Sequence, residues 1–188
     1  MENKSSMEAA PIEGPRLIET KTFADGRGYF RETYRQDELN RLLGRRVDFV
    51  QDNDSFSASV GVLRGLHFQR PPHAQAKLVK VVSGAIFDVI VDLRRSSATY
   101  GHWQGLRLEA GSGRQLFVPV GFAHGFCALT ENVHVSYKVS DYYDPAGEGG
   151  LVWNDAALAI DWPLAGAPII SEKDSRLPSL AELGRVFE

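Results

Sequence analysis

Arg64 and His67 stand three positions apart in the segment GVLRGLHFQ, residues 61–69, and both side chains are suited to acid–base or anion chemistry. The segment is typical of a β-strand, and at an odd separation a regular strand points two side chains to opposite faces. Gly65 lies between them, where a β-bulge would add one residue and turn both side chains into one pocket. We expect this bulge; the alternative is a half-buried histidine beside a surface arginine.

Lys77 and Tyr137 are two further side chains that could stabilise or transfer charge. Lys77 shares a strand face with Val79 and Val81, and a lysine among apolar side chains either extends its ammonium group to solvent or lies near an anion. Tyr137 shares a face with two valines in the segment VHVSYKVS, so its hydroxyl needs a hydrogen-bond partner. For each residue, a purely structural role is the alternative.

His124 ends the segment GRQLFVPVGFAH, whose glycine, proline, glycine and histidine spacing is that of the second cupin motif. Such a turn delivers a histidine into the mouth of a jelly roll. Metal-binding cupins also carry a first motif with two histidines two positions apart, but here Gln69 stands two positions after His67. A zinc or iron site needs three or more protein ligands, and only His67 and His124 are expected near one another. We therefore predict no metal.

The elements that must position these residues are mostly β-strands. The 18 glycines and 9 prolines separate short runs rich in Val, Ile, Phe and Tyr, a pattern typical of many short strands. Helices are predicted only at residues 36–43 and 180–186. No βαβ rhythm is present, so the pattern predicts a sandwich, barrel or jelly roll. Strands are predicted at residues 16–21, 49–53, 59–69, 76–82, 85–94, 100–108, 114–118, 123–129 and 133–140.

Composition excludes several classes of protein. The 21 Lys and Arg against 24 Asp and Glu give a net charge of −3, unlike a basic nucleic-acid-binding protein. With 43% hydrophobic and 24% charged residues, the chain can bury a full core. Cys127 is the single cysteine, residues 1–14 contain no apolar signal core, and no apolar run approaches the roughly 20 residues of a transmembrane helix. We expect a cytoplasmic protein that binds neither nucleic acid nor membrane.

One domain is expected at residues 15–188, after a loosely ordered tail at residues 1–14. Ordered blocks along nearly all of this domain resemble the dTDP-4-dehydrorhamnose 3,5-epimerase family, the cofactor-free cupins of deoxysugar biosynthesis. The blocks include FADGRGYFRE (23–32), QDN (51–53), GVLRGLHFQ (61–69), PVGFAHGF (119–126), YKVSDYY (137–143), WND (153–155) and KD (173–174).

The resemblance implies a homodimer of cupin jelly rolls, without a cofactor. The implied activity is that of an isomerase that inverts carbons 3 and 5 of dTDP-4-dehydro-6-deoxy-D-glucose. Its product would be dTDP-4-dehydro-L-rhamnose, in dTDP-L-rhamnose biosynthesis.

Individual roles also follow from the resemblance. His67 would be the general base, Asp174 the carboxylate that orients it, and Tyr137 the general acid. Lys77 and His124 would be further contacts of the reacting sugar, and Tyr143 would stack on a ring. The other substrate-binding residues would be Arg27, Glu32, Gln51, Asn53, Arg64, Glu148 and Lys173, with Arg27 a candidate to reach the partner subunit's site. Asp88 would orient His124 if its strand face lines the barrel.

The implied reaction explains why these residue types are needed. Inversion next to a ketone requires removal of a proton from one face and its return on the other, which one base cannot do. A histidine with a pKa of about 6.5 accepts a proton near neutral pH, and a carboxylate fixes its tautomer. Lys77 would stabilise the charge on the ketone oxygen, and Tyr137, with a phenol pKa of about 10, would return a proton. Arginines suit the diphosphate.

Three alternatives stay open. A one-centre epimerase would share every motif, because the angle of the tyrosine decides which carbon is protonated. A non-enzymic cupin that binds a sugar nucleotide would tolerate the loss of His67. A metallo-cupin oxygenase would bind iron, which Gln69 disfavours. Residues 54–59, and Ala76 where many relatives have glycine, depart from the family pattern beside the site and leave the sugar preference open.

Overall fold

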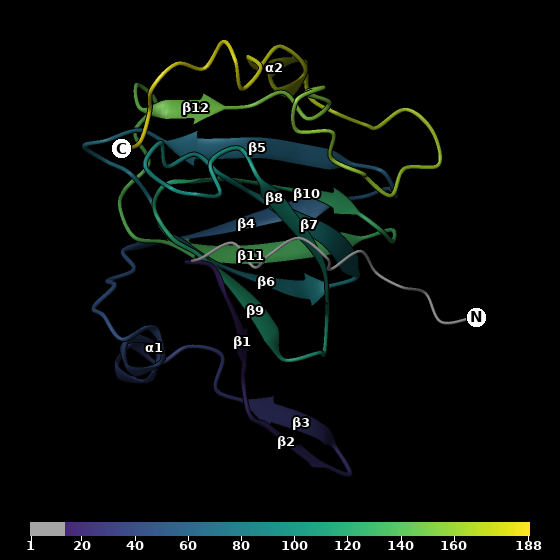
Figure 1. The fold of residues 1–188 in the computed structure, drawn as a ribbon. Coiled ribbons are helices and arrows are strands. Elements are labelled where there is room, and N and C mark those ends of the chain that lie inside the picture. Colours follow the sequence, from purple (N-terminus) through teal and green to yellow (C-terminus); the bar gives the residue numbers. More distant parts are fainter. Residues whose placement is uncertain (1–13) are drawn as a thin grey trace.

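Strands and tight turns alternate along residues 14–188, the part of the chain that the computed structural model describes. They form two five-stranded antiparallel sheets that face each other (Figure 1). In spatial order, the first sheet contains β1 (Arg16–Glu19), β9 (Arg114–Val118), β6 (Lys77–Ser83), β11 (Val133–Val139) and β4 (Gln51–Ser57). The second contains β12 (Glu148–Gly150), β5 (Leu63–Gln69), β10 (Phe122–Ala128), β7 (Ala85–Asp92) and β8 (Trp103–Glu109). The predicted mostly-β sandwich is confirmed.

Three small elements lie outside the two sheets. The hairpin of β2 (Thr22–Asp25) and β3 (Gly28–Arg31) projects from the sandwich beyond β1 (Figure 1). Helix α1 (Gln36–Leu43) has the predicted bounds and ends at Gly44, whose φ of 66° is in the left-handed region that glycine adopts readily. Helix α2 (Glu172–Ser175) is a single turn near β5. The expected tail at residues 1–14 lies outside the described residues except for Gly14.

The predicted helix at residues 180–186 is wrong, because residues 180–182 form a turn and residues 184–186 have no regular structure. The Leu183 amide donates to the Ser179 carbonyl, which is one helical turn, and Gly184 with a φ of 72° follows at once. The Leu180 amide is held by the Asp155 carboxylate. Apolar spacing in this segment therefore serves packing against the second sheet and not a helix.

Of the three apolar clusters in residues 14–188, two pack against the second sheet, and the third joins α1 to the first sheet. The first fills the space between the sheets and includes Val79, Ile86, Ile90 and Val135. The second lies on the other face of the second sheet, where residues 151–187 cover it with side chains such as Leu151, Leu158, Trp162 and Phe187. Strand β7 is therefore buried on both faces, and the covering segment carries α2 to the edge of the sandwich beside β5 (Figure 1).

Asp92, at the end of β7, is a fully buried carboxylate that fixes the following loop. It accepts hydrogen bonds from the Arg94 amide and guanidinium and from the hydroxyls of Ser97 and Thr99, at 2.7–2.9 Å. Burial raises the pKa of Asp92, but the hydrogen bonds from Arg94, Ser97 and Thr99 outweigh burial and lower this pKa to about 2. The ionised carboxylate thus stabilises the folded state.

Asp92→Asn should lower the free energy of unfolding at pH 7 by about 2 kcal/mol, because the folded pKa lies below that of the unfolded chain. The contribution is present above pH ~4 and is lost as the pH falls toward 2, so the difference from the wild type should shrink over that range. Urea titrations at several pH values measure it, with the exposed Asp161→Asn as control. Equal stability of Asp92→Asn and the wild type at pH 7 would contradict this account.

Candidate active site

A cavity of about 510 Å³ lies between the two sheets, and chemically active side chains enter it from both. His67 on β5 and His124 on β10 belong to the second sheet. Lys77 on β6 and Tyr137 on β11 belong to the first. Asp174 of α2 also lines the cavity. The two sheets thus bring basic and acidic groups to opposite walls of one space.

The predicted bulge at Gly65 is confirmed. On β10, His124 pairs with His67 and Phe126 pairs with Arg64, so two steps along β10 match three steps along β5. Both Arg64 and His67 consequently line the cavity. Gly65 has a φ of 119°, and a Cβ there would lie 2.6 Å from the Cα of Gly125, so only glycine fits.

His67 and Asp174 form the predicted pair. His67 Nε2 lies 2.9 Å from Asp174 Oδ1, and the Gly65 amide donates to Asp174 Oδ2 at 3.1 Å. Ser171 caps the turn by accepting from the Asp174 amide. Burial raises the pKa of Asp174, but the hydrogen bonds from His67 and Gly65 outweigh it, so the pKa is lowered. With Asp174 ionised, Nε2 carries the proton of the neutral imidazole and Nδ1 is the free acceptor.

Tyr137 and Lys77 occupy the wall opposite His67. Burial raises the pKa of the Tyr137 phenol, and the charge of Arg64 offsets part of the rise. Lys77 is 9% exposed and donates from Nζ to the His67 carbonyl at 3.2 Å. Burial lowers the pKa of Lys77 to about 8, against the opposing charges of Asp88 and Glu148. Lys77 therefore does not extend to solvent; its ammonium group contacts the backbone of β5 at His67.

His124, which lines the cavity, forms a second histidine–carboxylate pair with Asp88. Their Nε2 and Oδ1 atoms are 2.9 Å apart, and both side chains are buried. The strand face of Asp88 does line the interior, since Ile86 and Ile90 on that face belong to the core between the sheets. The geometry expected for Asp88 is thus present.

A smaller pocket of about 250 Å³ adjoins the cavity and shares His67, Lys77 and Tyr137 with it. Tyr143 donates from its hydroxyl to Glu148 at 2.9 Å, and Lys173 pairs with the same carboxylate. Burial raises the pKa of Glu148, but the hydrogen bonds from Lys173 and Tyr143 outweigh it and lower the pKa. Most of the expected substrate-binding residues therefore surround one continuous space. Its other polar lining residues include Gln51, Asn53, Gln69 and Gln75.

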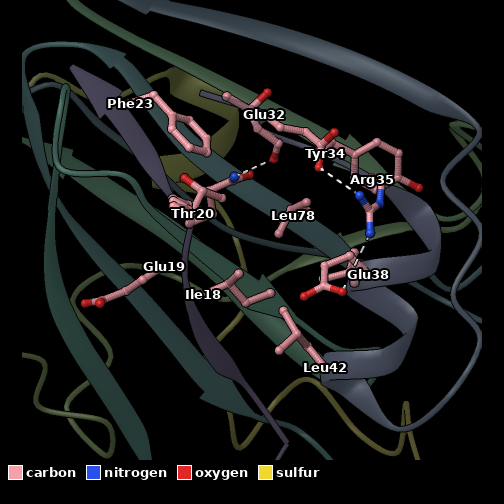
Figure 2. Close-up of a pocket in the computed structure, with 14 residues that line it drawn as sticks. Ile18, Glu19, Thr20, Phe23, Glu32, Tyr34, Arg35, Glu38, Leu42 and Leu78 are labelled. Atoms are coloured by element: carbon pink, nitrogen blue, oxygen red, sulfur yellow. Dashed lines mark hydrogen bonds and ion pairs between the residues drawn. The ribbon is translucent and has the colours of Figure 1, made fainter. Parts of the chain in front are cut away.

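Arg27 and Glu32 are not brought to this space within one chain. Arg27 lies in the turn of the β2–β3 hairpin and pairs with Asp25 at 2.6 Å. Glu32 lines a different pocket of about 410 Å³, formed by β1, the end of the hairpin and α1 (Figure 2). There Glu32 Oε1 lies 3.7 Å from Arg35 Nη1, and apolar side chains such as Leu78 also line the pocket.

Ser55 and Ser57 line the cavity and were not found by sequence reasoning. Strand β4 continues to Ser57, beyond the predicted end at residue 53. Every residue on the inner face of this strand is polar, so the alternation of apolar and polar residues that marks a half-buried strand is missing. Ser57 accepts from Arg64 Nε at 3.2 Å, and the Phe56 carbonyl accepts from Nη2 at 2.7 Å. The polar alternation from Gln51 to Ser57 was the available signal.

Two observations concern other kinds of site. Among residues 14–188, no three His, Cys, Asp or Glu side chains are grouped so that they could hold a metal ion. The absence of a metal stays a prediction. Within the same residues, no helix has the length and apolar character needed to cross a membrane.

Comparisons with known proteins identify the chain's relatives. Residues 9–182 match the family model described as dTDP-4-dehydrorhamnose 3,5-epimerase. An enzyme of that name from Pseudomonas aeruginosa PAO1 is 50% identical over 166 residues, 88% of this chain and 91% of the relative. A dTDP-4-dehydrorhamnose 3-epimerase from Streptomyces niveus is 44% identical over 171 residues, 91% of this chain and 82% of the relative.

A solved structure gives the same result for the fold. The crystal structure of the 3,5-epimerase from Bacillus anthracis, with TDP and PPi bound, superposes with a TM-score of 0.85 and 48% identity. The match covers 90% of this chain and 98% of that one. The predicted cupin jelly roll is thereby confirmed.

The lowered pKa of Lys77 predicts a lysine that loses its charge near pH 8. In an NMR titration of ¹³C-labelled lysine side chains, one signal should have a midpoint of about 8. That signal should be absent from Lys77→Arg and retained in Lys80→Arg, whose lysine lies on the outer face of the same strand. If every lysine signal titrates near the ordinary value of about 10.4, the burial argument is wrong.

Proposed function

The chain belongs to the dTDP-4-dehydrorhamnose 3,5-epimerase family, and from this premise we propose the reaction that it catalyses. It epimerises carbons 3 and 5 of dTDP-4-dehydro-6-deoxy-D-glucose to dTDP-4-dehydro-L-rhamnose, a step of dTDP-L-rhamnose biosynthesis. One observation carries the proposal: the histidine of a histidine–carboxylate pair and a partly buried phenol enter the same cavity from opposite sheets. That is the arrangement that inversion of a carbon requires.

His67 removes the proton. Its Nδ1 is the acceptor, since Nε2 is held by Asp174. The carboxylate has a lowered pKa, so it stays ionised and stabilises the imidazolium that forms. Carbons 3 and 5 both flank the ketone at carbon 4, and a proton on either is acidified by the same carbonyl.

Lys77 stabilises the enolate. With a pKa of about 8, its ammonium group is mostly charged at neutral pH, and Lys77 lines the same cavity as His67. A fixed cation at a developing oxyanion in a water-poor site contributes a few kcal/mol. His124, oriented by Asp88, is a second polar group on this path.

Tyr137 returns a proton from the other side of the sugar. Burial raises its pKa, so the phenol remains protonated until the carbanion accepts its proton. Because His67 and Tyr137 belong to different sheets, the proton that leaves and the proton that arrives use different faces of the hexose. Inversion follows from this geometry.

The adjoining pocket takes the nucleotide end of the substrate. Tyr143 offers a half-exposed ring for stacking, with Gln51, Asn53, Glu148 and Lys173 around it. Arg64 enters the main cavity with a guanidinium group oriented by Ser57, and guanidinium groups match phosphate oxygens.

A homodimer would complete this site. The β2–β3 hairpin projects from the sandwich and leaves Phe23, Tyr29 and Phe30 more than half exposed. A two-stranded hairpin is marginally stable alone, and exposed apolar clusters of this kind mark interaction surfaces. A second copy of the chain would cover them, and Arg27 in the hairpin turn would then reach the partner subunit's cavity. Glu32, which follows the hairpin, belongs to the same region.

The remaining parts of the proposal are simpler. Residues 15–188 act as one catalytic domain, without a cofactor and without a nucleic-acid partner. A cytoplasmic location is supported by Cys127, a free and buried thiol.

Deuterium incorporation from heavy water tests the reaction directly. With dTDP-4-dehydro-6-deoxy-D-glucose and chelator-treated enzyme, NMR should show deuterium at carbons 3 and 5 and the inverted product. His67→Ala should lose both signals by 10²–10⁴-fold, roughly the usual value of a general base. Tyr137→Phe should lose inversion to a similar extent but keep exchange, because the His67 side chain is 33% exposed and its proton can exchange with solvent.

The same experiment separates the alternatives. Label at one carbon only would indicate a one-centre epimerase, which the 44% identity to the Streptomyces niveus 3-epimerase favours as the second candidate. Absence of exchange in the wild type would contradict an enzymatic role on this substrate and favour a sugar-nucleotide-binding protein. Full exchange by His67→Ala would contradict the assignment of the base.

Mixed dimers test whether Arg27 acts in the partner's site. As homodimers, both Arg27→Ala and His67→Ala should have much lower activity than the wild type. For Arg27→Ala we expect a loss of at least about tenfold, since a guanidinium–phosphate contact is charge-assisted. Co-expression with two affinity tags yields the mixed dimer, in which one site has both His67 and the partner's Arg27. Activity near half of the wild type per dimer is expected there.

If Arg27 acted within its own chain, every site of the mixed dimer would carry one lesion and no activity would return. Co-expression of His67→Ala with Asp174→Asn is the matched control, because His67 and Asp174 of one chain act in the same cavity of that chain. In that mixed dimer each site carries one lesion, so activity should stay low.

A further inference from the structure

Gln69 is a buried glutamine at the end of β5, two positions after His67. Both residues line the smaller pocket, which also holds Tyr143. The proposed reaction assigns no role to Gln69, which is only 4% exposed. Buried polar groups in folded proteins nearly always make hydrogen bonds, so the partners of this amide indicate what it does.

The Gln69 amide joins two loops beside the pocket. Nε2 donates to the Tyr142 carbonyl at 2.9 Å and to the His73 carbonyl, and Oε1 accepts from the Asp144 amide at 2.9 Å. His73 lies in the loop between β5 and β6, and the other two lie in the loop between β11 and β12. A primary amide has two N–H donors and one acceptor oxygen. Both donors and the oxygen are thus engaged by backbone groups of the loops.

Tyr143 lies between the two peptide groups that Gln69 holds in the second loop, one before it and one after it. The Tyr143 amide donates to Gln51 Oε1 at 3.1 Å, and the Tyr143 hydroxyl donates to Glu148 at 2.9 Å. Tyr143 is 53% exposed, so apolar packing contributes little to its position. Its ring is therefore placed mainly by hydrogen bonds, and those of Gln69 fix the backbone from which it extends.

Two other contacts between the same loops lie farther from the ring. Ser140 Oγ accepts from the Ala76 amide at 2.8 Å, and Gln75 Nε2 donates to the Asp141 carbonyl at 2.8 Å. They join the loops two or three positions before Tyr143, close to the end of β11. The loops can therefore stay joined near the strands even where the contacts of Gln69 are lost.

We propose that Gln69 is a positioning residue for substrate binding, whose amide holds Tyr143 ready to stack on the nucleotide. The inference rests on the proposed function and deepens it, because it assigns the order of the nucleotide pocket to a side chain that does not touch the substrate. A ring that is fixed in the free protein need not be ordered when the substrate binds. Loss of such order typically weakens binding by up to about tenfold.

Gln69→Met keeps the length of the side chain and removes its donors and its acceptor. We expect the Kd for dTDP and the KM for the 4-keto-hexose substrate to rise by about tenfold. The value of kcat should stay nearly unchanged, because His67 and Tyr137 keep their positions and only binding is weakened. Ser140→Ala is the matched control: it removes a contact between the same loops away from the ring and should not change the Kd for dTDP.

A double-mutant cycle separates this role from a purely structural one. If Gln69 acts through the Tyr143 ring, Gln69→Met should not raise the Kd for dTDP further in a Tyr143→Ala background. Calorimetry measures this Kd for the wild type, both single variants and the double variant, and NMR assays give KM and kcat. Gln69→Glu is a second variant of similar shape. Its carboxylate can accept from the Asp144 amide but has no donor for the two carbonyls, so it should weaken dTDP binding as well.

Several results would overturn the inference. Unchanged dTDP affinity in Gln69→Met and Gln69→Glu would show that the ring does not depend on the amide. An equal rise of the Kd in the Tyr143→Ala background, or in Ser140→Ala, would show that Gln69 supports the fold and not the ring. A lower kcat at unchanged KM would place its effect on the proton-transfer groups.

Failure of the proposed function is distinguishable from failure of this inference. A wild type that binds dTDP but does not convert the 4-keto-hexose would overturn the proposed reaction alone, since the affinity cycle tests Gln69 without turnover. A wild type that does not bind dTDP would overturn both.

Discussion

Inversion of a carbon requires two proton-transfer groups that face each other across the substrate, and the two sheets of this sandwich supply them. The gap between the sheets narrows to an apolar core at Val79, Ile90 and Val135 and elsewhere leaves a cavity of about 510 Å³. His67 stands on one sheet and Tyr137 on the other, so their separation is fixed by sheet packing. Side chains carried by the strands of a packed sheet are held in well-defined positions. This suits a reaction whose outcome depends on the face from which each proton is removed or added.

The orientation of the base depends on packing far from the cavity. Asp174 reaches His67 because residues 151–187 are fixed on the outer face of the second sheet by an apolar core that contains Trp162 and Phe187. The Asp155 carboxylate accepts from the amides of residues 157, 158 and 180 and joins the two ends of this segment. The bulge at Gly65 then serves two purposes: it turns His67 inward and donates its amide to Asp174. One local departure from regular strand pairing thus orients His67 and also holds the carboxylate of Asp174.

Local patterns predicted the parts of the fold in which apolar periodicity follows burial. Helix α1 and strand β9 are of this kind, whereas the Gly65 bulge was predicted from a glycine between two polar residues at an odd separation. Patterns failed where another demand set the residue types: the inner face of β4 is polar because it lines the cavity, and the β2–β3 hairpin leaves its apolar residues exposed. The pairing of His67 with Asp174 spans 107 positions, and no local spacing indicates it. For that contact the resemblance of ordered blocks to a known family was the available guide.

A crystal structure of Tyr137→Phe with dTDP-4-dehydro-6-deoxy-D-glucose would test the central claim most directly, because the variant retains the cavity and cannot complete inversion. The account predicts the hexose between the sheets, with the His67 ring on one face and the ring of residue 137 on the other. It also predicts the ketone oxygen within hydrogen-bond distance of Lys77 Nζ. A hexose with both rings on the same face, or one bound outside this cavity, would contradict the account.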